Sequence, residues 1–140
     1  MKSSKTRIGL VAVDGFAALS ALLGGVMVAT GWPYAFPASW LRGTPFADYT
    51  LPGLILGIVV GGSAGVATVL TIKYARAGAA ASLVAGVVMM GWIVGEVAIL
   101  AVYTWLQPVY LAVGLSMAVL AVRVALAARH QAAHGRLLPI

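Results

Sequence analysis

The sequence predicts an all-α membrane protein, a single domain of 140 residues in which four transmembrane helices form an antiparallel bundle. The first reason is composition, because 62% of the residues are hydrophobic and 9% are charged, whereas about 25% charged residues are usual in soluble domains. The second is that the apolar residues form four long runs. The third is that basic residues lie at the ends of these runs, as in membrane proteins.

Each apolar run is long enough to cross a membrane, since a hydrocarbon core about 30 Å thick needs roughly 20 apolar residues in a helix. The expected helices cover residues 8–30, 51–72, 79–102 and 108–128. We expect Gly31 to end the first and Gly78 to break the link before the third. The first run is too long for the apolar region of a secretory signal, which has about 7–15 residues, so we interpret it as a membrane anchor.

Two prolines agree with this division of the chain. Pro52 and Pro108 fall in the first turns of the second and fourth expected helices. A proline is tolerated there because the missing N–H would have no partner within the helix.

Basic residues predict the orientation, because cytoplasmic links carry an excess of Lys and Arg. Eight of them flank one side of the expected membrane: Lys2, Lys5, Arg7, Lys73, Arg76, Arg123, Arg129 and Arg136. The other side holds only Arg42. We therefore expect both termini, including the tail 129–140, to be cytoplasmic and the loop 31–50 to lie outside.

Aromatic residues gather in or beside the predicted outer links, where nine of the twelve in the chain lie. The residues that we assign to an outer aromatic cap are Trp32, Tyr34, Phe36, Trp40, Phe46, Tyr49 and Trp105. On one interpretation they anchor the protein at the headgroup level, which Trp and Tyr prefer. On the other they form a surface for lipid or a partner, because a large apolar patch usually marks a contact.

Three strings resemble small four-helix membrane proteins of unknown function from high-GC bacteria. They are residues 41–53 (LRGTPFADYTLPG), residues 91–96 (GWIVGE) and residues 105–108 (WLQP). The resemblance covers most of the chain and implies the fold but no activity. For a bacterial protein, the distribution of basic residues predicts a multi-pass location in the cytoplasmic (inner) membrane.

Glycines recur every four residues in the second expected helix, at Gly53, Gly57, Gly61 and Gly65. Residues at this spacing stack along one face, and such a glycine zipper lets another backbone approach closely. The first helix carries a matching strip of small residues, namely Ala17, Ala21, Gly25 and Ala29. The glycine face packs either against a helix of the same chain or against a second copy or another member of a membrane complex.

Three ionisable residues lie inside the expected membrane helices, namely Asp14, Glu96 and Arg123. Such residues are costly in lipid and are therefore functional candidates. Asp14 and Arg123 both lie about 9 Å from the inner ends of their helices, so we expect them to form a salt bridge. In the alternative, Arg123 extends to the inner headgroups while Asp14 meets water or Arg7.

Glu96 lies in the outer third of its helix, roughly 16 Å from Asp14 in depth, which is too far for the two carboxyl groups to act together. We expect it to be protonated, because an ionised carboxylate without a cation is costly in lipid, and to hydrogen-bond a backbone carbonyl or one of the tyrosines Tyr34, Tyr49 and Tyr103. It is either a structural acid or a proton or cation site, as in small multidrug transporters that use one membrane carboxylate.

The residue types exclude most kinds of chemistry. The chain has no Cys, which excludes disulfides and thiolate metal sites, and no expected membrane helix holds a His that could bind haem or activate a serine. His130 and His134 have no third metal ligand nearby. We therefore expect no cofactor. The basic residues are scattered rather than clustered, which argues against nucleic acid.

We therefore expect a non-enzymatic membrane protein that contacts membrane lipid and is an accessory or oligomer-forming component of a membrane complex. The alternative is a small proton- or cation-coupled transporter that works as a dimer through Glu96 or Asp14, since four helices do not easily enclose a pathway alone. A membrane enzyme that acts on a lipid or quinone at the outer cap is a third possibility.

Overall fold

A computed structural model of the chain describes residues 2–31, 39, 42–100 and 106–137 and contains no strand among them. The elements are α1 (Lys2–Thr30), α2 (Thr50–Leu54), the π-helix η2 (Ile55–Gly61), α3 (Gly62–Lys73), α4 (Ala75–Leu100) and α5 (Leu106–Leu137). Within the described residues, four spans are long and apolar enough to cross a membrane: Lys5–Thr30, Thr50–Lys73, Ala75–Ile99 and Gln107–His130. The prediction of an all-helical protein with four such helices is thus confirmed.

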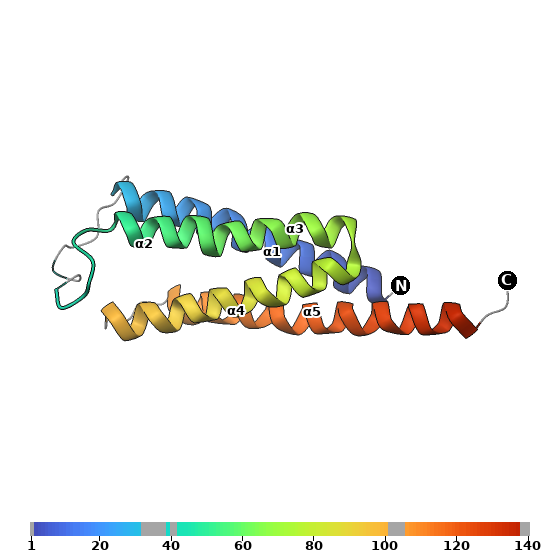
Figure 1. The fold of residues 1–140 in the computed structure, drawn as a ribbon. Coiled ribbons are helices and arrows are strands. Elements are labelled where there is room, and N and C mark those ends of the chain that lie inside the picture. Colours follow the sequence, from blue (N-terminus) through green and yellow to red (C-terminus); the bar gives the residue numbers. More distant parts are fainter. Residues whose placement is uncertain (1, 32–38, 40–41, 101–105, 138–140) are drawn as a thin grey trace.

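The long helices lie side by side (Figure 1). Both chain ends and the link between α3 and α4 lie at one end of the molecule, and the segment 42–49 lies at the other. α2, η2 and α3 follow one another without a break. α5 extends beyond the other helices at the end that carries the termini.

Two helices are longer than the apolar runs that predicted them. α1 begins at Lys2 rather than at residue 8, and α5 continues to Leu137 rather than ending at residue 128. The added residues include Lys, Arg, Gln and Ala, which favour helix without needing lipid around them. An apolar run therefore marks the part of a helix that can cross the membrane and not the ends of the helix.

Gly31 ends α1, as predicted. Its φ of 72° lies in the left-handed region that glycine adopts without strain. Its N–H donates a hydrogen bond to the Met27 carbonyl at 2.8 Å, which is a common way to end a helix.

The link between α3 and α4 is shorter than the sequence indicated. Only Tyr74 is extended, with φ −137° and ψ 114°, and Gly78 lies inside α4. The prediction that Gly78 breaks the link is therefore wrong. Gly78 instead permits close packing, since a Cβ at this position would lie 2.6 Å from Thr71 Oγ1 and closer still to the Thr71 backbone.

A very close contact joins α1 to the second span. A Cβ at Gly25 would lie 2.6 Å from Gly57 Cα and 2.7 Å from the Gly53 carbonyl oxygen. A Cβ at Gly53 would lie 2.7 Å from Ala29 Cα. These distances leave no room for a side chain at Gly25 or Gly53, so the two backbones touch directly.

The contact continues to Gly61 and then ends. A Cβ at Gly61 would lie 3.0 Å from Leu22 Cγ of α1, whereas a Cβ at Gly65 would have nothing within 4 Å. The π-helix η2 includes Gly57 and Gly61. Its wider turns offset the drift that a four-residue repeat has in a helix of 3.6 residues per turn. In α3 the drift returns, and Gly65 turns away from α1.

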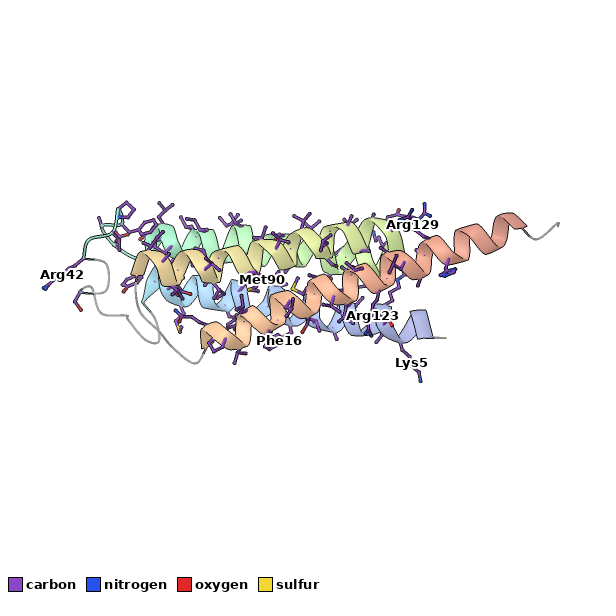
Figure 2. The ribbon with its side chains drawn as sticks, turned by 90° about the horizontal axis from the view of Figure 1, so that it is seen from below. Lys5, Phe16, Arg42, Met90, Arg123 and Arg129 are labelled. Atoms are coloured by element: carbon purple, nitrogen blue, oxygen red, sulfur yellow. The ribbon has the colours of Figure 1, made fainter. Side chains whose placement is uncertain are left out.

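Small residues also fill the core between the helices. The main buried cluster contains Ala17, Ala18, Ala21, Val60, Ala64, Ala67, Ala85, Met89 and Met117, and a second cluster contains Leu10, Ala79, Ala121 and Val124. α4 and α5 approach closely where a Cβ at Gly86 would lie 2.7 Å from the Gly114 carbonyl oxygen. Met90 of α4 lies beside this contact (Figure 2) and would be 2.8 Å from a Cβ at Gly114.

We expect Gly25→Ala to lower the free energy of unfolding by about 1–3 kcal/mol, the usual cost of overpacking, because the added methyl group would overlap the Gly57 backbone. Gly65→Ala is the matched control and should cost nothing, because its Cβ meets open space. Unfolding in a denaturing detergent, followed by circular dichroism, measures both. Equal stability of the two variants would contradict the proposed tight contact.

Candidate functional site

Asp14 belongs to a buried polar cluster where α1, α3 and α4 meet. Asp14, Thr71 and Ser82 are each 0% exposed. Ser82 Oγ of α4 donates a hydrogen bond to Asp14 Oδ2 at 2.5 Å and lies 3.2 Å from Thr71 Oγ1 of α3. Thr71 Oγ1 donates to the Ala67 carbonyl at 2.7 Å. A continuous line of oxygen atoms therefore joins the three helices.

The local sequence explains how these short side chains meet. Thr71 and Ser82 are separated by 11 positions, and the one-residue link at Tyr74 folds α4 directly back on α3. Gly78 then lets the two backbones approach at Thr71, which brings the hydroxyl groups within reach of each other. On the other side, Gly15 of α1 packs near Thr68 of α3, whose Cγ2 would be 3.9 Å from an added Cβ.

Arg123 is not the partner of Asp14, so the predicted salt bridge is wrong. Asp14 is fully buried, whereas Arg123 is exposed on α5 (Figure 2). Asp14 Oδ2 is bonded to Ser82, and Oδ1 has no hydrogen-bond partner among the described residues. Val124, the next residue on α5, faces the core, and successive helical residues point about 100° apart. Equal depth therefore did not place the two charges face to face.

Arg7 binds the end of α3 instead of Asp14. Its Nε donates to the Thr71 carbonyl at 2.7 Å, and its Nη2 donates to the Ile72 carbonyl at 3.0 Å. Carbonyls in the last turn of a helix have no partner within the helix, and a cation is favourable there. Arg7 therefore fixes the start of α1 to the end of α3, beside the polar cluster.

Glu96 belongs to a separate part of the molecule. It is half-buried on α4, 14 positions beyond Ser82 (82 to 96), which is about 21 Å along the helix at 1.5 Å per residue. The two membrane carboxyl groups therefore cannot act on one small substrate. Tyr34 and Tyr103, two of its expected partners, lie outside the described residues, so its hydrogen bonding and protonation stay predictions.

The outer aromatic cap is covered only in part by the described residues. Phe46 and Tyr49 are half-buried in the segment 42–49. The remaining cap residues, Trp32, Tyr34, Phe36, Trp40 and Trp105, lie outside the described residues. The cap thus stays a prediction, both as an anchor and as a contact surface.

Ser82 and Thr71 are the site residues that the sequence analysis missed. The available signal was weak, because Ser and Thr in apolar helices usually bond to a carbonyl of their own helix. Ser63, Thr68 and Ser116 do so here, at 3.0, 2.8 and 2.8 Å. The useful signal was depth, since Asp14 and Ser82 lie in the first halves of α1 and α4 and Thr71 lies near the end of α3. These three helix ends lie at the same end of the molecule (Figure 1).

The cluster offers one carboxyl group and two hydroxyl groups. Among the described residues no group of three or more His, Cys, Asp and Glu could hold a metal ion, and no His lies beside the hydroxyls to activate them for hydrolysis. The cluster can hold a proton or bond a polar group. No protein family model, curated protein or solved structure matches this chain.

We expect Ser82→Ala to lower the free energy of unfolding by about 1–3 kcal/mol, the cost of leaving a buried polar group without its partner. Arg123→Gln should change it by less than about 0.5 kcal/mol, as is usual for exposed positions. Ser63→Ala is the control, because its hydroxyl bonds only within α3 and η2.

A double-mutant cycle with Asp14→Asn separates the two possible partners. Ser82→Ala should show a coupling energy with Asp14→Asn, and Arg123→Gln should show none. A coupling energy between Asp14→Asn and Arg123→Gln, with none between Asp14→Asn and Ser82→Ala, would support the salt bridge and contradict the polar cluster.

Proposed function

We propose that the protein is a non-enzymatic membrane protein that assembles with further copies of itself, as a homo-oligomer or within a larger membrane complex. A groove of small residues on the surface of α3 and α4 carries this proposal. It has a volume of about 400 Å³ and is lined by Gly62, Ser63, Val66, Ala80, Ala81 and Val84. Its shape and lining suit a helix of a second copy.

The packing within the chain supports this reading of the groove. Helices in lipid are not drawn together by the hydrophobic effect, so their association depends on close packing and small residues favour it. The contact of Gly25 with Gly53 and Gly57 is an example within one chain. Gly62 offers a similar surface in the groove, and a Cβ at this position would have nothing within 4 Å.

The proposal places the chain in the bacterial cytoplasmic membrane as an antiparallel bundle with both termini in the cytoplasm. The positions of the basic residues support this orientation. Lys5 and Arg129 lie toward the end that carries the termini, whereas Arg42 lies at the opposite end (Figure 2). An excess of Lys and Arg marks the cytoplasmic side, and the outer aromatic cap belongs to the side of Arg42.

The buried Asp14 favours a second candidate, proton-coupled transport by a dimer. Intramembrane carboxyl groups are frequent parts of proton pathways. A groove of about 490 Å³ between α1 and α5 is lined by Val13 and Phe16 but not by Asp14. In this candidate, a second copy completes the route to Asp14. Proton flux into vesicles that Asp14→Asn abolishes would favour this candidate.

We expect Gly62→Leu to dissociate the oligomer while leaving the monomer as stable as before, because Gly62 lines the groove and a Cβ there has nothing within 4 Å in the chain. Light scattering after size-exclusion chromatography in a mild detergent measures the oligomeric state. Gly9→Leu is the matched control, since a Cβ at Gly9 also meets open space but lies outside the groove. An unmodified chain that is monomeric in both detergent and lipid vesicles would refute the assembly.

The orientation predicts which positions a membrane-impermeant thiol reagent reaches. The chain has no Cys, so single-cysteine variants are labelled without background. Ser39→Cys should react in intact cells, and Tyr74→Cys, at the exposed α3–α4 link, should react only after permeabilisation. The reverse pattern would invert the proposed topology.

A further inference from the structure

The line of oxygen atoms from Asp14 to Ala67 contains three contacts, but its two hydroxyl groups have only two hydrogen atoms to donate. The three contacts, Asp14–Ser82, Ser82–Thr71 and Thr71–Ala67, measure 2.5, 3.2 and 2.7 Å. Ser and Thr each provide a single O–H donor. If Asp14 is ionised, one of the three contacts therefore has no hydrogen between its two oxygens.

A proton on Asp14 completes the line. In this neutral form the direction of the Asp14–Ser82 bond is reversed, so that the Asp14 carboxyl O–H donates to Ser82 Oγ. Ser82 then donates to Thr71 Oγ1, and Thr71 donates to the Ala67 carbonyl. Each hydroxyl group both accepts and donates one hydrogen bond. Buried polar networks stabilise a protein when every member is satisfied and become costly when one is not.

An ionised Asp14 would have too few donors around it. A carboxylate offers about four acceptor positions, yet Ser82 is the donor at Oδ2 and Oδ1 has no hydrogen-bond partner among the described residues. A buried charge with so little compensation is very costly. A neutral acid leaves only one carbonyl oxygen unsatisfied, which costs much less.

The charged groups on the surrounding helices do not supply the missing compensation. Arg7, the basic residue nearest to the cluster, is bonded to the carbonyls of Thr71 and Ile72. Most of the others are exposed. Besides Asp14, the charged or titratable residues with described side chains on α1, α3, α4, α5 and the α3–α4 link are Lys5, Arg7, Lys73, Tyr74, Arg76, Glu96, Tyr110, Arg123, Arg129 and His130.

A metal cation fits the cluster less well than a proton does. Ca²⁺ and Mg²⁺ take six or more oxygen ligands, and the three side chains offer two carboxyl and two hydroxyl oxygens. Ser82 Oγ lies 2.5 Å from Asp14 Oδ2, which leaves no space for an ion between these two atoms.

We propose that Asp14, Ser82 and Thr71 form an intramembrane proton-binding site in which Asp14 holds one proton at neutral pH and donates it in a hydrogen bond to Ser82. The site deepens the second candidate function and is independent of assembly through the α3–α4 groove. Thr71 lies two positions before the end of α3, at the end of the molecule that carries the termini, so water on that side is the source of the proton.

Infrared spectroscopy of the full-length protein in lipid vesicles tests the site directly, because a protonated carboxyl group has a carbonyl band distinct from that of a carboxylate. The chain has only three acidic residues. In a Glu96→Gln background, subtraction of the Asp14→Asn spectrum isolates the contribution of Asp14 from that of Asp48. We expect a protonated-carboxyl band at pH 7 that Asp14→Asn removes.

Substitution of the hydroxyl residues then tests the geometry. Ser82→Ala should shift the Asp14 band to higher frequency, because it removes the acceptor of the Asp14 proton. Ser82→Cys should give a smaller shift, and this variant replaces Ser82→Ala in the test if the alanine variant does not fold. Ser20→Ala, whose hydroxyl donates to the Ala17 carbonyl of its own helix, is the control and should leave the band in place. The absence of an Asp14-dependent acid band at pH 7, or a band that neither Ser82 variant moves, would overturn the proposal. Both outcomes leave the measured oligomeric state untouched, so the assembly proposal is judged separately.

Discussion

The close approach of helix backbones is the constraint on which the rest of this structure depends. A chain in lipid has no water to drive its helices together, so packing at short range has to do this. Gly25 against Gly57, Gly78 against Thr71 and Gly86 against Gly114 are all positions where a side chain would overlap a neighbouring backbone or side chain. The alanine-rich core extends the same principle between these points.

The polar cluster follows from that close approach. Ser and Thr have short side chains, so a hydroxyl on one helix reaches a hydroxyl on the next only where the backbones nearly touch. Gly78 creates this condition for Thr71 and Ser82, and Arg7 holds α1 against the same end of α3. The carboxyl group of Asp14 thus bonds through Oδ2 to a hydroxyl group that packing has brought beside it, while Oδ1 has no hydrogen-bond partner among the described residues.

Apolar run length was sufficient to predict the helices that can cross a membrane, because that property depends on local composition. The partner of Asp14 was not predictable in the same way, since depth follows from counting residues but the rotation of a helix about its axis does not. Arg123 matches Asp14 in depth but lies on an exposed face of α5. Ser82 resembles Ser63 and Ser116 in sequence, and only the fold distinguishes the serine that bonds across helices from those that bond to their own carbonyls.

The length of α5 has a mechanical consequence. Its 32 residues span about 48 Å at 1.5 Å per residue, compared with a hydrocarbon core about 30 Å thick. α5 is thus longer than a membrane crossing requires, and its last part extends beyond the other helices as a continuation of the same helix (Figure 1). A helix that continues without a break transmits tilt and rotation, so the projecting part of α5 is a lever arm. A displacement of α5 within the bundle would be carried to its far end.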